Sequence, residues 1–318
     1  MIVDTLTVVY RDEIELLHKQ AEKFNLYTPQ FSVKNIFVIV NDDKLTTDDI
    51  NHDWWAWHRD KVRVMHRSEF GYYPPPSMKG WYTQQICKIL GVCQAQSEWC
   101  LIYDAKTIPN RDYKVELLFD GNRARCANWA ESMSPHWDSG VQFLKDKFGI
   151  TDFKWISPAG VPFLAHVPTM RAMVYEEPDF VEWFHTYCDF PNKFNSQTRG
   201  ITEFLCYSAY VSSIPGLFEE LYTGESGIEV RNLADWEADK FDSWMAEVKR
   251  ITPFTVSTHP RAYKLLNQPF INCCKSFSHE AKYRKYVSFI SSRIWDIVSA
   301  KWVKSCSDAF ISGLNCAR

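Results

Sequence analysis

The sequence is poor in glycine and lacks the glycine-rich phosphate loops of many nucleotide-binding proteins. It contains 12 glycines in 318 residues. Neither G-x-G-x-x-G nor G-x-x-x-x-G-K-[ST] occurs in it. These absences exclude a Rossmann-type dinucleotide fingerprint and a P-loop.

Three further absences narrow the class of protein. The net charge is −3, so no global basic field exists to drive nonspecific binding to nucleic acid or membrane. None of the ten cysteines forms C-x-x-C, which argues against a structural zinc site. The first residues, Met1 to Asp4, lack the features of a secretory signal, and the longest aliphatic runs, such as Ile36 to Val40, are only strand-length. We therefore expect no membrane insertion, a cytoplasmic location and reduced thiols.

Aromatic residues, by contrast, are abundant. The chain has 13 Trp, 15 Tyr and 21 Phe. Core packing accounts for most of them, although aromatic rings also suit sites that stack on a sugar or a base.

The first hundred residues alternate between strand and helix patterns. Leu6 to Tyr10 and Asn35 to Val40 are β-branched apolar runs, and between them Asp12 to Phe24 has helical spacing. A third strand at Val62 to Met65, a helix from Gly80 to Leu90 that stops at Gly91, and a strand at Trp99 to Tyr103 follow. This alternation predicts an α/β fold with a mostly parallel central sheet.

The second half has a less regular pattern. It predicts a strand at Asp112 to Phe119 and helices at His136 to Phe148, Asp179 to Tyr187, Thr198 to Val211, Ala234 to Val248 and Glu280 to Val303. No linker or repeat interrupts the chain. We therefore expect one domain over residues 1–318, with a C-terminal helical part.

Polar residues follow three of the predicted strands: Tyr10 to Asp12, Asn41 to Asp43, and Asp104 to Thr107. Ligands of open α/β sheets bind outside the carboxyl ends of the strands. Acidic groups there suit the hydroxyls of a nucleotide or a divalent cation. The alternative is that these residues only form turns and helix caps.

Several segments resemble known motifs. Leu101 to Asn110 (L-I-Y-D-A-K-T-I-P-N) is similar to the L-D-A-D-T-I-P segment of GT-A-type glycosyltransferases. Gly80 to Leu90 (G-W-Y-T-Q-Q-I-C-K-I-L) resembles the G-W-x-x-Q-Q-x-x-K helix of a poorly characterised bacterial and phage family of glycosyltransferases. Ile201 to Val211 resembles the S-E-Y-x-x-Y-x-x-Y-V segment of that family, and Val8 to Asp12 matches its Y-x-x-D strand end in part.

The resemblance implies a GT-A-like three-layer α/β/α sandwich, with a nucleotide-sugar-binding half at 1–120 and an acceptor-binding half at 121–318. It implies transfer of a sugar from a nucleotide-sugar, with a UDP-sugar as the first expectation, in the cytoplasm of the host if the chain is phage-encoded. Tyr10, Asp12 and Asp43 would be donor-binding residues. Gln84, Gln85 and Lys88 would line the donor side of the site, with a solvated helix face as their structural alternative.

The D-x-D motif of such enzymes is altered in this sequence. Asp104 stands at its first position, and Lys106 stands where the last aspartate would hold a Mn²⁺ or Mg²⁺ ion. An ammonium group cannot bind a cation, but it can neutralise a diphosphate directly. Two readings stay open: a metal held by Asp104 and His259, or Lys106 in place of the metal.

Glu203 is the predicted general base, a role that implies an inverting reaction. Its structural alternative is a favourable charge at a helix N-terminus. The expected acceptor is a saccharide. A hydroxymethylated base in phage DNA is the other acceptor class, because basic and aromatic residues mix at Arg59 to Arg67 and at His279 to Tyr286. The alternative function is a non-catalytic nucleotide- or sugar-binding protein that has lost the D-x-D motif. The oligomeric state is not predicted.

Overall fold

The computed structural model describes residues 1–76, 78, 80–109, 112, 114–125, 137–151, 153, 161–188, 200–224, 230–233 and 255–258. The chain divides into two units, Met1–Asn267 and Gln268–Arg318, and all described residues belong to the first. The single domain over 1–318 and its two functional halves stay a prediction. The helices predicted at 234–248 and 280–303 lie outside the described residues.

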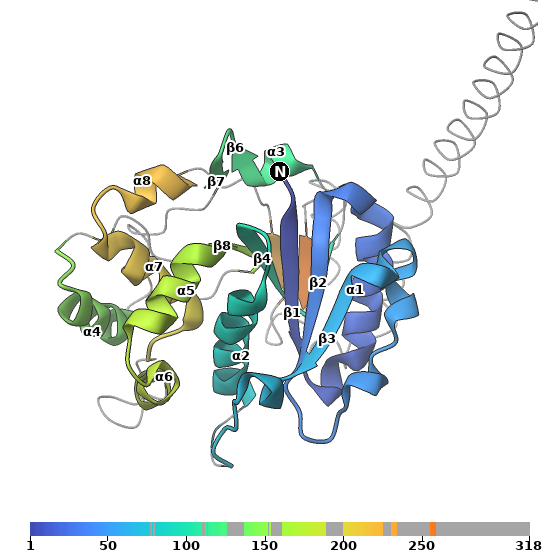
Figure 1. The fold of residues 1–318 in the computed structure, drawn as a ribbon, viewed down its shortest axis with the longest axis horizontal. Helices are drawn as coiled ribbons and strands as arrows, with labels where there is room; N and C mark the ends of the chain where they lie inside the picture. The colour runs from blue at the N-terminus through green and yellow to red at the C-terminus, as the bar shows by residue number, and fades with distance from the viewer. Residues whose placement is uncertain are drawn as a thin grey trace, which may run out of the picture. The chain divides into compact units, whose positions relative to one another are not determined.

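A five-stranded sheet with the order β3-β2-β1-β4-β8 forms the centre of the first unit (Figure 1). Its strands are β1 (Val3–Val9), β2 (Val33–Val40), β3 (Val62–His66), β4 (Trp99–Asp104) and β8 (Phe163–His166). Strands β1 to β4 run parallel to their neighbours, and β8 runs antiparallel to β4. The α/β class and the mostly parallel central sheet predicted from the sequence are therefore confirmed.

Helices cover both faces of this sheet. All seven residues of β1 are buried, and successive side chains of a strand point to opposite faces. Leu6 packs against α2 (Gly80–Gln94), whereas Thr7 donates a 2.9 Å hydrogen bond to Gln20 on α1 (Ile14–Tyr27). The sheet thus lies between α1 and α2 in a three-layer arrangement.

Two sequence predictions are wrong in detail. Gly91 does not end its helix, because α2 continues to Gln94. A Cβ at Gly91 would lie 2.4 Å from Leu6 Cδ1, so glycine allows the helix to approach the sheet closely. The strand predicted at 112–119 contains helix α3 (Val115–Leu118), whose Glu and Leu residues are good helix formers, and only its last residue, Phe119, begins a strand.

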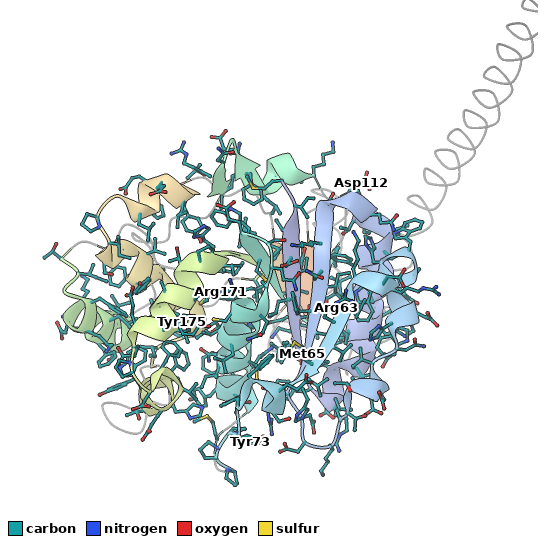
Figure 2. All side chains as sticks on the ribbon, viewed as in Figure 1. Arg63, Met65, Tyr73, Asp112, Arg171 and Tyr175 are labelled. Carbon is teal, nitrogen blue, oxygen red and sulfur yellow. The ribbon has the colours of Figure 1, made fainter. Side chains whose placement is uncertain are left out.

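The remaining helices gather on the β8 side of the sheet, away from β3 (Figure 1). They are α4 (Asp138–Phe148), α5 (Val167–Glu176), α6 (Phe180–Cys188), α7 (Glu203–Ser213) and α8 (Leu217–Leu221). Arg171 on α5 donates to the carbonyls of Cys93 and Ala95 at the end of α2, and Figure 2 shows it beside that helix. The charged side chain therefore ties the helical side of the molecule to the sheet.

Short elements complete the described part. Two three-stranded sheets have the orders β10-β11-β5 and β6-β7-β9. Their strands are β5 (Thr107–Pro109), β6 (Phe119–Asp120), β7 (Arg123–Arg125), β9 (Tyr222–Thr223), β10 (Val230–Leu233) and β11 (Thr255–Thr258). The 3-10 helices are η1 (Arg11–Glu13), η2 (Gln30–Ser32), η3 (Thr47–Asp49), η4 (His52–Lys61) and η5 (Arg67–Phe70). Within the described residues, no helix has both the length and the apolar character to cross a membrane.

Candidate functional site

The carboxyl end of β4 is held in place by a buried glutamine of α1. Gln20 Nε2 donates 2.7 Å hydrogen bonds to the carbonyls of both Asp104 and Thr107, while its Oε1 accepts from Thr7. These bonds satisfy the backbone of the turn that links β4 to β5. Because both ends of the turn are fixed, Asp104 and Lys106 have a defined position at the edge of the sheet.

Asp104 is buried and is surrounded by cationic and amide groups. Its Oδ1 lies 2.7 Å from Lys88 Nζ and 3.4 Å from Gln84 Nε2, and its Oδ2 lies 3.2 Å from Lys106 Nζ. Burial alone would raise the pKa of Asp104, but the charges of Lys88 and Lys106 hold it well below its usual value. Asp104 is therefore ionised at neutral pH. Gln84 and Lys88 reach it together because residues four apart lie on one face of a helix.

Glu203 meets the same lysine from the opposite side. Its Oε1 lies 2.9 Å from Lys88 Nζ, and its backbone N–H donates to Gln85 Oε1 at 3.1 Å. Glu203 is the first residue of α7, and the side chain of Thr202 caps that helix. Burial would lower the pKa of Lys88, but the carboxylates of Asp104 and Glu203 raise it, so this ammonium keeps its charge.

A third carboxyl, Glu13, belongs to the same group although the sequence did not single it out. It is 7% exposed, whereas the predicted donor-binding residue Asp12 beside it is exposed. Burial and the negative charge of Asp104 raise the pKa of Glu13 to about 7, while Lys106 and Lys88 oppose that rise. We call Glu13, Lys88, Asp104, Lys106 and Glu203 the carboxylate–lysine cluster.

A signal for Glu13 was present in the sequence. It stands three residues after Tyr10, the N-cap of η1, which is the spacing at which a glutamate side chain returns to the backbone of the N-cap residue. In the structure the Glu13 N–H donates a 2.9 Å hydrogen bond to the Tyr10 carbonyl, which closes the 3-10 turn. The side chain therefore turns inward, and Asp12 stays outside.

Two other predicted residues lie in a separate polar network. The Tyr10 hydroxyl donates to the Gly80 carbonyl at the start of α2 and accepts from Asn41 Nδ2 at 2.5 Å. Arg67 Nη1 donates to Asn41 Oδ1 at 2.9 Å, and its Nη2 pairs with Asp43. The Asp43 side chain is 80% exposed. This network joins the ends of β1, β2 and β3 to α2. It therefore positions the loops around the cluster.

Comparison with known proteins relates this chain to one family and to several solved structures. A family model described as a family of unknown function matches residues 5–250, which is most of the chain. The chain belongs to the family DUF6492. No curated protein matches it.

Similar solved structures were also found. They include the bifunctional glycosyltransferase WbbM in its apo form, with 12% identity and a TM-score of 0.43 over 80% of this chain and 45% of that one. The galactosyltransferase LgtC in complex with donor and acceptor sugar analogues has 12% identity and a TM-score of 0.44, covering 86% of this chain and 96% of that one. Mouse xyloside xylosyltransferase 1 in its apo form has 12% identity and a TM-score of 0.35, covering 77% and 93%. The chain thus spans less than half of the WbbM chain.

The described residues around Asp104 do not by themselves form a site for a divalent cation. Both of its carboxylate oxygens already face an ammonium group, at 2.7 and 3.2 Å. In the described part of the chain, no group of three or more His, Cys, Asp or Glu side chains is arranged to hold a metal ion. His259, the other predicted ligand, lies outside the described residues, so a metal held by Asp104 and His259 stays a prediction.

A pocket of about 570 Å³ lies away from this cluster, along the edge strand β3. Figure 2 labels two of its lining residues, Arg63 and Met65. No member of the carboxylate–lysine cluster lines it. The cluster itself is tightly packed, and its most accessible member is Lys106, whose side chain is 26% exposed. A ligand would therefore reach the cluster from the side on which Lys106 lies.

Proposed function

We propose that this DUF6492 chain is a glycosyltransferase that uses a nucleotide-sugar donor. One observation carries the proposal: Lys88 and Lys106 meet on Asp104 at the carboxyl edge of a parallel sheet, beside two further buried carboxyls. Open α/β sheets bind ligands at that edge. The motif resemblance of Gly80 to Leu90, Leu101 to Asn110 and Ile201 to Val211 supports the same reaction class.

The proposed reaction breaks one bond and forms another at the anomeric carbon of the sugar. An acceptor hydroxyl oxygen attacks that carbon, and the bond from the carbon to the phosphate oxygen breaks. The electron pair of that bond stays on the nucleoside diphosphate, whose charge becomes more negative. The proton of the acceptor hydroxyl passes to a carboxylate of the protein.

Lys106 is proposed to stabilise the leaving diphosphate in place of a metal ion. It stands at the position where a D-x-D motif has its last aspartate, and it is the cluster member most open to solvent. Preorganised positive charge at a developing anion is a large source of rate enhancement. Lys88 is fully enclosed between Asp104 and Glu203, so its positive charge would act on the diphosphate from behind Lys106.

The base is proposed to be a buried carboxyl of the cluster. Glu203 is the candidate that the sequence indicated, and the carboxyl of Glu13 is the second. Attack assisted by such a base would give inversion at the anomeric carbon. Replacing Glu203 with Gln is expected to lower turnover while leaving donor affinity nearly intact.

A saccharide hydroxyl is the acceptor that we propose. The described basic residues near β3 do not favour DNA, because they are engaged within the protein. Lys61 donates to the carbonyls of Gln30 and Val33, and Arg59 pairs with acidic neighbours. A hydroxymethylated DNA base stays the second acceptor class, and non-catalytic binding of the nucleotide-sugar stays the alternative function.

The test is nucleotide release from UDP-, GDP- and CMP-linked sugars, with water as the acceptor. Wild-type protein is expected to release nucleotide from at least one donor, and Lys106→Met to lose most of that activity. Lys19→Met is the matched control, because Lys19 lies on α1 and, among the described residues, pairs with the exposed Glu22 and not with the cluster. Absence of both turnover and a thermal shift with every donor would refute the glycosyltransferase. A shift without turnover would favour the binding protein.

A further inference from the structure

The three carboxyls of the cluster differ in their partners. Asp104 faces two ammonium groups, and Glu203 faces one. Within the described residues Glu13 forms no ion pair, and its Oε2 has no hydrogen-bond partner although the atom is buried. Buried polar side-chain atoms are nearly always hydrogen-bonded in folded proteins. The free oxygen of Glu13 therefore requires an explanation.

The position of Glu13 is well defined. The Glu13 N–H donates a 2.9 Å hydrogen bond to the Tyr10 carbonyl, and the hydroxyl of Tyr10 is in turn anchored on Gly80 and Asn41. The side chain is 7% exposed, and the charges of Asp104 and Lys106 act on it. Glu13 is thus a fixed carboxyl with one unused oxygen that belongs to the cluster.

We propose that Glu13 is the catalytic base, and that its carboxylate accepts the proton of the hydroxyl that attacks the anomeric carbon. This inference rests on the proposed glycosyl transfer and specifies its residue. The O–H bond of the acceptor breaks, its electron pair forms the new bond to the anomeric carbon, and the proton is left on Glu13. The bond between the anomeric carbon and phosphate breaks, and its electron pair leaves with the diphosphate.

Glu13 suits this step better than Glu203 for an electrostatic reason. Protonating Glu203 would remove the charge that faces Lys88 at 2.9 Å inside the protein. Lys88 would keep Asp104 at 2.7 Å but lose one of its two carboxylates, and loss of a partner from a buried ion pair is destabilising. Protonating Glu13 breaks no ion pair of the described residues. Burial also raises its pKa to about 7, which makes the ionised form a stronger base than an exposed glutamate near neutral pH.

Glu203 then has a different task. It acts as a positioning residue, because it holds Lys88 against Asp104 from the N-terminus of α7. Burial raises the pKa of Glu203 as well, against the opposing charge of Lys88. Both glutamates affect turnover in this scheme, but only Glu13 takes a proton from the acceptor. The pH profile of the rate therefore separates the two roles.

The experiment compares Glu13→Gln and Glu203→Gln with the control Glu15→Gln. Glu15 lies on α1 close to Glu13 in sequence, and it is exposed. Nucleotide release from the donor that the wild-type protein turns over is measured between pH 5 and 9, with water as the acceptor. Melting temperatures are measured for every variant in the same buffers, and Glu13→Ala is assayed with and without added azide or formate.

Glu13→Gln is expected to lower kcat at least about 100-fold with KM for the donor changed less than about threefold. The wild-type rate should fall below about pH 7, whereas the residual rate of Glu13→Gln should not. Added azide should partly restore the activity of Glu13→Ala. Glu203→Gln should keep that acid limb, and Glu15→Gln should behave as wild type.

The inference is overturned if Glu13→Gln keeps kcat within threefold of wild type, or if the acid limb disappears with Glu203→Gln instead. If Glu13→Gln fails to fold, absence of any anion rescue of a folded Glu13→Ala overturns it. These results leave the glycosyltransferase standing, because the wild-type protein is still active. Absence of turnover by the wild-type protein overturns both proposals.

Discussion

Removal of the enclosed ammonium of Lys88 should destabilise the protein severely. Lys88 Nζ lies 2.7 Å from Asp104 and 2.9 Å from Glu203, and all three residues are buried. Lys88→Met keeps the length of the side chain but leaves Glu203 without its lysine and Asp104 with Lys106 alone. Loss of one partner from a buried ion pair costs about 3–5 kcal/mol. For a folded unit of this size, 1 kcal/mol changes Tm by about 2–4 °C, so Tm should fall by roughly 6–20 °C.

The charges of the cluster also predict how pH changes the loss of stability in Lys88→Met. The pKa of Asp104 is held low in the folded protein, so its pairing stabilises the fold at neutral pH and is lost only on acidification. In Lys88→Met the carboxylates lose their cation and become easier to protonate. The difference in Tm between wild type and variant should therefore be smaller at pH 5 than at pH 8.

Thermal unfolding at the two pH values measures both effects. Lys106→Met is the control, because its side chain is 26% exposed and contacts only one carboxylate oxygen, so the loss should be below about 1 kcal/mol. Adding Glu203→Gln to Lys88→Met should recover part of the lost stability, since it removes the buried carboxylate that has lost its cation. A Lys88→Met protein that melts within about 2 °C of wild type at pH 8 would refute the reasoning.

Three further outcomes can be checked directly. Gly91→Ala should lower stability by about 1–3 kcal/mol in urea unfolding, because its Cβ would meet Leu6 Cδ1 at 2.4 Å; an unchanged midpoint would contradict this close approach. Glu13→Gln should be more stable than wild type at pH 8, with an upper bound of about 3 kcal/mol from the rise in pKa from 4.5 to about 7. Wild type binds more protons when folded between these values, so its stability falls as pH rises through them, and the gain should vanish below pH 4.5. Nucleotide release should persist in EDTA, whereas its loss on chelation and return with Mn²⁺ would show that a metal takes part.

The sequence predicted the parts of the site that depend on local geometry. Gln84 and Lys88 lie on one helical face because they are four residues apart, and Asp104 ends a strand whose apolar run was evident. Glu203 follows a capping threonine, and the structure places it at the start of α7. Each of these rests on a pattern a few residues long.

Features that depend on the surroundings of a residue were not evident from the local pattern. Gly91 was expected to end a helix, but it provides space for Leu6 instead. Asp12 was preferred to Glu13, although the 3-10 turn of η1 exposes the first and buries the second. Asp43 lies at the end of β2 as predicted, yet it pairs with Arg67 and not with the cluster.

By itself, the sequence determined the alternation of strands and helices, the parallel sheet and the residue types at its carboxyl edge. Periodicity and short-range spacing are sufficient for those features. Only the tertiary structure decided which charges meet, since Lys88 and Glu203 lie 115 positions apart in the chain. Burial then distinguishes the carboxyls, because an enclosed charge is stable only beside an opposite one: within the described residues Asp104 and Glu203 have their lysines, and Glu13 has no ion pair.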